Sequence, residues 1–211
     1  MSTTSSQGPS RRAVVTWLFI VAALVFIMVV VGGITRLTES GLSMTDWHPV
    51  TGWLPPLSEA AWQAEFDKYK AFPEYQKVNL GMTLDAFKMI YAWEFSHRLL
   101  GRIIGLAFFV PMAFFMLTGQ IRRREIPWFL FLLVAGGSQG ALGWFMVQSG
   151  LVDRPDVSQS RLAAHLTLAF SIYALLLWTA WSVREEGRDR QALSGMQTPA
   201  IILAALVLLQ I

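Results

Sequence analysis

Long blocks of apolar residues alternate with polar segments along this chain of 211 residues. Four of these blocks have about 20 residues each, the length that a helix needs to cross the hydrocarbon core of a bilayer. A fifth block, 199–211, is too short to cross as a helix that rises about 1.5 Å per residue. The pattern therefore predicts an all-α integral membrane protein, a four-helix transmembrane bundle with spans at 14–33, 93–119, 127–146 and 162–183.

The polar segments between the blocks predict how the chain is divided. We expect an inside tail at 1–13, a four-helix half at 14–190 that includes a long outer loop at 35–92, and the start of a second half at 191–211. Because the fifth block stops short of a full span, we expect the chain to be the first part of a longer protein.

Arginine positions predict the orientation of the spans, since Lys and Arg concentrate in the short cytoplasmic segments of membrane proteins. The arginines that share one side of the predicted bundle are Arg11, Arg12, Arg122, Arg123, Arg124, Arg184, Arg188 and Arg190. The N-terminus is therefore predicted to be cytoplasmic and the long loop to lie outside. The net charge of +3 follows from this bias, and without a basic stripe it gives no indication of nucleic-acid binding. The chain has no cysteine, which excludes disulfides and thiolate ligands within it.

Two histidines are predicted to lie at one depth in the membrane. His97 and His165 each come a few residues after the outer start of a span, on the order of 10 Å below the surface at the rise of a helix. Two imidazoles on facing helices suit the axial ligands of a heme iron. Interhelical hydrogen bonding is the alternative for each histidine. His48 stands before a proline in DWHPVTG, and we expect no ligand role for it.

Charged residues accompany these histidines. Glu94 precedes His97 by three residues and is predicted to share its helical face, either to take part in proton transfer or to orient the imidazole. Arg98 and Arg102 are expected on another face, and Arg161 lies one turn before His165. These arginines either bind heme propionates or extend to lipid headgroups.

Aromatic and small residues give two further predictions. Outer-loop aromatic residues are expected to form an interfacial belt. The spacing Gly136-xxx-Gly140 is typical of helices that approach closely. The residues of the expected belt are Trp47, Trp53, Trp62, Tyr69 and Tyr75.

Five segments resemble one known family. They closely resemble segments of heme A synthase, in the form found in mitochondria and alphaproteobacteria, and together they cover most of the chain. The segments are GGITRLTESGLSMTDWHPVTGWLPP, EFDKYKAFPEYQKVN, FKMIYAWEFSHRLLGR, GGSQGALGWFMVQSGL and RLAAHLTLA.

The resemblance implies an eight-helix protein made of two similar halves, each with a histidine pair. The first half receives heme O and the second holds a heme b that carries electrons. The enzyme oxidises the C8 methyl group of heme O to a formyl group, making heme A for cytochrome oxidase. By resemblance, His97 and His165 are the metal ligands and Glu94 is the catalytic acid residue. Arg36, Arg98 and Arg161 join the residues predicted to bind the substrate heme.

The resemblance also implies partners and a location. We expect heme O as substrate, heme O synthase as its donor, an electron donor that the sequence does not identify, and a lipid bilayer. Homo-oligomer formation is left open. The location implied is the bacterial inner (plasma) membrane, or the mitochondrial inner membrane if the source is eukaryotic. Without the heme b ligands of the second half, this chain is expected to bind a porphyrin and to lack the means to oxidise it.

Two other functions use the same residues. A membrane b-type cytochrome that carries electrons without modifying heme would need the histidines and no carboxylate near the ring edge. A transporter or proton channel would use Glu94 and His97 as a relay. The optical spectrum of the purified protein distinguishes these possibilities.

Overall fold

The structure is a computed structural model that describes residues 11–47, 51–152 and 155–185. All regular structure in these residues is helical. Four helices are long and apolar enough to cross a membrane. They are α1 (Arg12–Leu37), α4 (Leu84–Leu117), α5 (Ile126–Gln148) and α6 (Gln159–Arg184), and two short helices, α2 (Glu59–Lys70) and α3 (Pro73–Lys77), connect the first two. The prediction of an all-α bundle with four candidate spans is confirmed.

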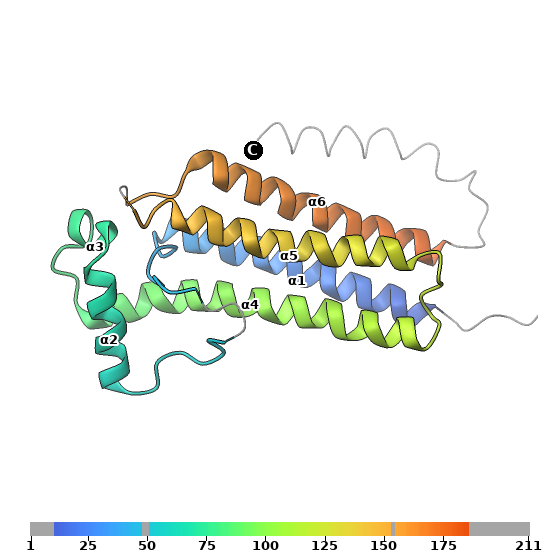
Figure 1. The fold of residues 1–211 in the computed structure, drawn as a ribbon, viewed down its shortest axis with the longest axis horizontal. Coiled ribbons are helices and arrows are strands. Elements are labelled where there is room, and N and C mark those ends of the chain that lie inside the picture. The colour runs from blue at the N-terminus through green and yellow to red at the C-terminus, as the bar shows by residue number, and fades with distance from the viewer. Residues whose placement is uncertain (1–10, 48–50, 153–154, 186–211) are drawn as a thin grey trace, which may run out of the picture.

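The four long helices form a bundle with α2 and α3 at one end, which we call the loop end (Figure 1). Helix α1 packs against both α4 and α6, and α5 packs against α6 and, less extensively, against α4. Within the described residues, α4 and α6 have no extended contact with one another. Helices α4 and α6 therefore occupy opposite corners of the bundle, separated by α1 and α5.

A cluster of buried aromatic and aliphatic residues lies toward the end of the bundle opposite the loop end. The ring of Trp17 lies 5.2 Å from that of Phe108, 5.4 Å from Phe115 and 6.0 Å from Phe129. Its indole N–H donates to the carbonyl oxygen of Ala107 over 2.7 Å, so the buried polar group is satisfied. Packing of this kind holds helices together in lipid, where exclusion of water gives no driving force.

Helix α4 begins at Leu84, nine residues before the predicted span at 93–119. Thr83 caps the helix by accepting a hydrogen bond from Ala86, and Asp85 lies in its first turn, where a negative charge is favourable. Because Asp85 and Lys88 are charged, the apolar pattern did not extend to these residues, and the sequence did not predict the first nine residues of α4 as part of the span. In Figure 1 the first turns of α4 run past the ends of α5 and α6 to meet α2.

The segment between α1 and α4 has its own small hydrophobic core. Tyr69, on α2, has no exposed surface, and Trp62 and Tyr75 pack against the same cluster. The predicted aromatic belt is therefore wrong for these residues, because α2 turns its aromatic face toward α4. Trp47 and Trp53 remain substantially exposed, as a belt would require. The buried residues of this core are Met44, Phe66, Tyr69, Phe87 and Tyr91.

Parts of the predicted division lie outside the described residues. These parts are 1–10 of the inside tail, the segment 191–211 assigned to a second half, and His48. Arg12, placed in the tail by the sequence, is the first residue of α1.

Candidate functional site

The two histidines predicted to bind iron come from helices at opposite corners of the bundle. His97 belongs to α4 and His165 to α6, and these helices have no extended contact with each other in the described residues. His97 lies in the first half of α4 and His165 in the first half of α6, and both helices begin at the loop end (Figure 1). The fold therefore places both histidines toward that end, and their pairing at an iron stays a prediction.

Each imidazole lies against a glycine on a neighbouring helix. A Cβ atom on Gly32 of α1 would lie 3.1 Å from Nε2 of His97, and one on Gly143 of α5 would lie 3.0 Å from Cε1 of His165. Both distances are shorter than ordinary van der Waals contacts, so a larger residue would require the ring or a helix to shift. All four helices thus contribute to the surroundings of the imidazole pair.

The glycines predicted to bring helices together have a different environment. A Cβ atom on Gly136 or Gly140 would meet no atom of the described residues within 4 Å. The prediction from the Gly136-xxx-Gly140 spacing is therefore not supported in this chain. Among the glycines of the long helices, the closest approach occurs instead where a glycine faces an imidazole.

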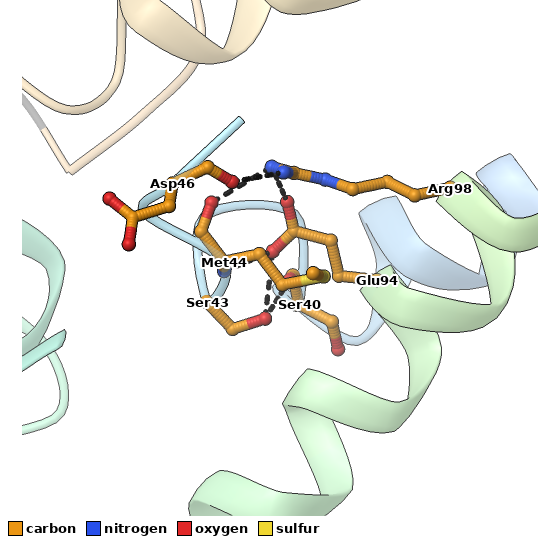
Figure 2. Close-up of polar contacts among 6 residues, drawn as sticks. All are labelled: Ser40, Ser43, Met44, Asp46, Glu94 and Arg98. Atoms are coloured by element: carbon orange, nitrogen blue, oxygen red, sulfur yellow. Dashed lines mark hydrogen bonds and ion pairs between the residues drawn. The ribbon is translucent and has the colours of Figure 1, made fainter. Parts of the chain in front are cut away.

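Glu94 is buried and accepts three hydrogen bonds, none of them from His97. The hydroxyl of Ser43 and the backbone N–H of Met44 each donate to Oε2 over 2.7 Å. Arg98, one turn further along α4, donates to Oε1. Figure 2 shows this carboxylate enclosed by the turn that follows α1. These contacts make Glu94 an anchor for that turn. They do not support the alternative that Glu94 orients the imidazole of His97.

Arg98 completes the same anchor. Its Nη1 donates to the backbone oxygen of Asp46 over 2.8 Å, and its Nη2 donates to that of Met44 over 2.8 Å (Figure 2). Arg98 therefore shares the face of Glu94, as residues four apart on a helix do, whereas the sequence analysis placed it on another face. Its donors are directed at the protein's own loop in this structure.

The other predicted arginines lie in varied surroundings. Arg161 donates to the carbonyl oxygen of Phe145 over 2.7 Å, and its guanidinium lies 3.7 Å from the centre of the Phe145 ring. It thus ties the start of α6 to the last turns of α5. The Arg102 guanidinium lies 6.0 Å from the ring of Trp53. Arg36 is exposed in the last turn of α1, where it is accessible to a ligand.

A second buried carboxylate, Glu74 of α3, was not singled out from the sequence. It accepts a hydrogen bond of 2.9 Å from the hydroxyl of Tyr69, which in turn accepts one of 2.8 Å from the Asn79 side-chain amide. Removal from water raises the pKa of Glu74 to about 7, the Tyr69 bond opposes that rise, and the nearby charge of Glu94 adds to it. In the string FPEY, a charged residue stands among aromatic residues, and this pattern could have predicted that Glu74 is buried.

Gln139 of α5 is a second residue that the sequence analysis missed. Its side-chain nitrogen donates to the backbone oxygen of His165 over 3.0 Å and lies 3.2 Å from Nε2 of the same residue. A polar side chain within a predicted span is costly in lipid, and that cost was the signal that could have identified it.

A cavity of about 330 Å³ lies at the loop end, beside the anchored turn. It is separate from the imidazole pair, since neither histidine lines it. The residues that line it include Met44, Asp46, Leu54, Glu65, Tyr91 and Phe95.

The surroundings of the imidazole pair fit an iron porphyrin. Nδ1 of His165 is buried without a hydrogen-bond partner among the described residues, so the ring is only partly held by the protein. Neutral imidazole nitrogens are common heme ligands, and the two rings come from helices that do not pack directly on each other.

Comparisons with known proteins agree with these features. The chain matches the COX15-CtaA family, described as cytochrome oxidase assembly protein, over residues 15–211. It is 58% identical over 201 residues to heme A synthase of Parvibaculum lavamentivorans, covering 95% of this chain and 58% of that protein. It is 56% identical over 203 residues to heme A synthase of Azorhizobium caulinodans, covering 96% and 58% respectively.

A third relative matches over a similar share of its length. The chain is 48% identical over 211 residues to heme A synthase of Nitrosospira multiformis, covering 99% of this chain and 59% of that protein. No solved structure matches the chain. The chain thus spans somewhat more than half the length of these curated relatives, and on the match over residues 15–211 it belongs to the COX15-CtaA family of cytochrome oxidase assembly proteins.

Proposed function

We propose that this chain is the substrate-binding half of a heme A synthase, which oxidises the C8 methyl group of heme O to a formyl group. The observation that carries the proposal is the pair of imidazoles, His97 and His165, each lying against a glycine. The names of the relatives, all heme A synthases, support the same reaction. The product, heme A, serves cytochrome oxidase.

The two histidines are the proposed axial ligands of the substrate iron. Arg36 and Arg161 are proposed to bind its propionates, because guanidinium groups pair with carboxylates. The exposed position of Arg36 supports this role, while Arg161 would have to share its donors with Phe145. Arg98 is proposed to contribute to binding through the turn that it holds, since its hydrogen bonds within the described residues are with that turn and with Glu94.

Glu94 is proposed to be required for oxidation, as the family resemblance implies. Its three hydrogen-bond donors support a role in which the carboxylate fixes the turn 43–46 beside the site. A carboxylate offers about four lone pairs, so a direct role in proton transfer would have to use the one lone pair of Oε1 that these three bonds leave open. The present contacts therefore favour a positioning role for Glu94 over a role as a free base.

The complete reaction needs parts that this chain does not include. Two successive hydroxylations of the methyl group followed by loss of water give the formyl group, and each hydroxylation is a two-electron oxidation that needs an oxygen-atom source and a redox partner outside this chain, proposed as the electron donor. A heme b in a second half is the proposed electron carrier. We propose that the four-helix half occupies 14–190, with the N-terminus cytoplasmic and 35–92 outside in an inner membrane. Heme O synthase is the proposed donor of the substrate.

The proposal is tested in a full-length heme A synthase that carries this sequence. His97→Ala and His165→Ala should each shift the Soret band of added heme O away from its position with two axial imidazoles and stop heme A formation, because alanine offers no ligand to iron. His48→Ala is the matched control, since the sequence predicts no ligand role for it, and it should behave as the unaltered protein does. Extracted hemes are identified by chromatography and mass.

The same experiment separates the alternatives. Normal heme A formation by a folded His97→Ala protein would contradict the paired-ligand assignment. A protein that binds heme b at these histidines and never yields heme A is an electron-transfer cytochrome. A protein without any Soret absorption would favour a transporter or proton channel.

A further inference from the structure

The Gln139 side chain fixes which nitrogen of His165 carries hydrogen. A carboxamide NH₂ group only donates hydrogen bonds, and the backbone oxygen of His165 only accepts them. The bond of 3.0 Å between these groups therefore places the NH₂ end of Gln139, and not its oxygen, beside the imidazole. The second N–H of the same group faces Nε2 of His165 at 3.2 Å.

A nitrogen that faces a donor must supply its electron pair. Nε2 of His165 is then the acceptor, and the ring hydrogen belongs on Nδ1. Nε2 with a free electron pair is a form in which an imidazole can bind a metal. The ring is thus held in a metal-binding tautomer by a residue of the neighbouring helix α5.

Two buried polar atoms of this pair have no hydrogen-bond partner among the described residues. They are Oε1 of Gln139 and Nδ1 of His165. Unsatisfied buried polar atoms cost free energy, and native proteins contain few of them. Both atoms belong to the one side-chain pair that adjoins the proposed heme site, and Nδ1 without an acceptor shows that no group of the described residues besides Gln139 fixes the tautomer of the ring.

We propose that Gln139 is a positioning residue for His165, which keeps the ring hydrogen on Nδ1, so that the Nε2 electron pair can bind the iron of heme O once the Gln139 N–H withdraws from it. The inference rests on the proposed function. The bond from Gln139 to the backbone oxygen of His165 does not involve the ring, so the carboxamide keeps one partner after Nε2 is released. No step of this exchange requires a change of protonation.

His97 has no equivalent of Gln139. Its ring makes no hydrogen bond with the described residues, and its Nε2 lies near Gly32. The positioning by Gln139 therefore acts on one of the two proposed ligands. A change at Gln139 should alter His165 and leave the ring of His97 as it was.

The first test measures the tautomer of His165 in the ligand-free full-length protein by ¹⁵N NMR of labelled histidine. We expect the Nδ1–H form in the unaltered protein. In Gln139→Glu, carboxylate oxygens face the ring and should favour the Nε2–H form. In Gln139→Leu both forms should be populated. Gln148→Leu, on the same helix, is the control and should leave the signal unchanged. An Nδ1–H form that persists in the Leu and Glu proteins would overturn the proposal.

The second test is titration with heme O, followed by the Soret band. We expect affinity to fall at least tenfold in Gln139→Glu and two- to threefold in Gln139→Leu, with the Gln148→Leu control unchanged. Equal affinity in all four proteins would contradict the positioning role. If Gln139→Glu does not fold, the Leu protein still decides through its NMR signal. If the unaltered protein binds no heme O, the proposed function fails, while the tautomer measurement stands on its own.

Discussion

Two carboxylates at the loop end are buried to the same extent and held in opposite ways. Glu94 is 3% exposed and Glu74 is 4% exposed. Glu94 accepts bonds from a hydroxyl, a backbone N–H and the guanidinium of Arg98. The one hydrogen bond found to the Glu74 carboxylate within the described residues comes from the neutral hydroxyl of Tyr69. Burial alone therefore does not distinguish them.

The difference lies in the groups that surround each buried carboxylate. A cation and two further donors compensate Glu94 for the loss of water. Within the described residues no cation contacts Glu74, and burial raises its pKa to about 7. Glu94 accordingly has the properties of a structural anchor, and Glu74 those of a group that changes charge near neutral pH.

The largest effect is expected from Glu94→Gln. The amide offers one oxygen where the carboxylate offered two, and its NH₂ group must face a donor, while Arg98 loses its counter-charge. Breaking one side of a buried ion pair costs about 3 to 5 kcal/mol. We expect a corresponding loss in the free energy of unfolding in detergent, with faster hydrogen exchange at the backbone of Met44.

Glu65→Gln is the control for that experiment. Glu65 also accepts a hydrogen bond from a cation, Lys68, but at the surface of α2. Its substitution should change stability by less than about 1 kcal/mol. If Glu94→Gln were as mild as Glu65→Gln, the three hydrogen bonds to Glu94 would contribute nothing as an anchor.

Glu74→Gln should change the pH dependence of stability. The folded protein binds a proton on Glu74 up to about pH 7, whereas the ordinary pKa is 4.5, so the unaltered protein loses stability as pH rises through this window. The loss is at most about 3 kcal/mol, since each pKa unit corresponds to 1.36 kcal/mol. Glu74→Gln should be free of this loss and therefore more stable than the unaltered protein at pH 8.

Thermal unfolding in detergent at pH 5 and pH 8 measures this effect. The difference between the two proteins should grow with pH, with Glu74→Gln gaining relative to the unaltered protein. Parallel pH profiles would show that Glu74 is ionised in both states, and the contrast with Glu94 would disappear.

The sequence predicted the bundle well, because spans of about 20 apolar residues are a strong signal. It also predicted one level for the two histidines from the direction of each span, and both lie toward the loop end of the bundle (Figure 1). The outer segment was less predictable. The first turns of α4 and the core around Tyr69 depend on contacts between segments, and no periodic apolar run in the sequence announces those contacts.

Side-chain roles were the least predictable part of the candidate site. The three-residue spacing suggested that Glu94 faces His97, yet its partners come from a turn about 50 residues earlier in the chain. The spacing of Gly136 and Gly140 suggested helix contact, whereas close approach occurs at Gly32 and Gly143. The spacing of residues in the sequence predicts which of them share a helical face. It does not predict which segments pack against that face, because those contacts depend on the tertiary fold.

A smaller effect is expected from Tyr69→Phe. This change removes the donor to Glu74 and leaves the Asn79 side-chain amide without its acceptor. One lost buried hydrogen bond costs about 1 to 2 kcal/mol. Because the Tyr69 bond holds the pKa of Glu74 down, the pH at which stability falls should move upward. In a protein that already carries Glu74→Gln, that movement should vanish, since no titrating group remains at position 74.

The smallest effect is expected from Lys68→Ala, which separates exposed from buried anchoring of the same turn. Lys68 donates to Asp46 over 2.9 Å and to Glu65 over 2.8 Å, and the two carboxylates raise the pKa of its ammonium group. Asp46 is also the residue whose backbone oxygen binds Arg98, so a surface pair and a buried pair hold one segment. Because water screens the surface pair, we expect Lys68→Ala to lower the free energy of unfolding by less than about 1 kcal/mol, and by still less in high salt.

The stability of Lys68→Ala is measured in low and high salt beside Glu94→Gln. A loss that matches the Glu94→Gln loss would place the anchor of the turn at its surface, and the buried carboxylate would then be free for chemistry.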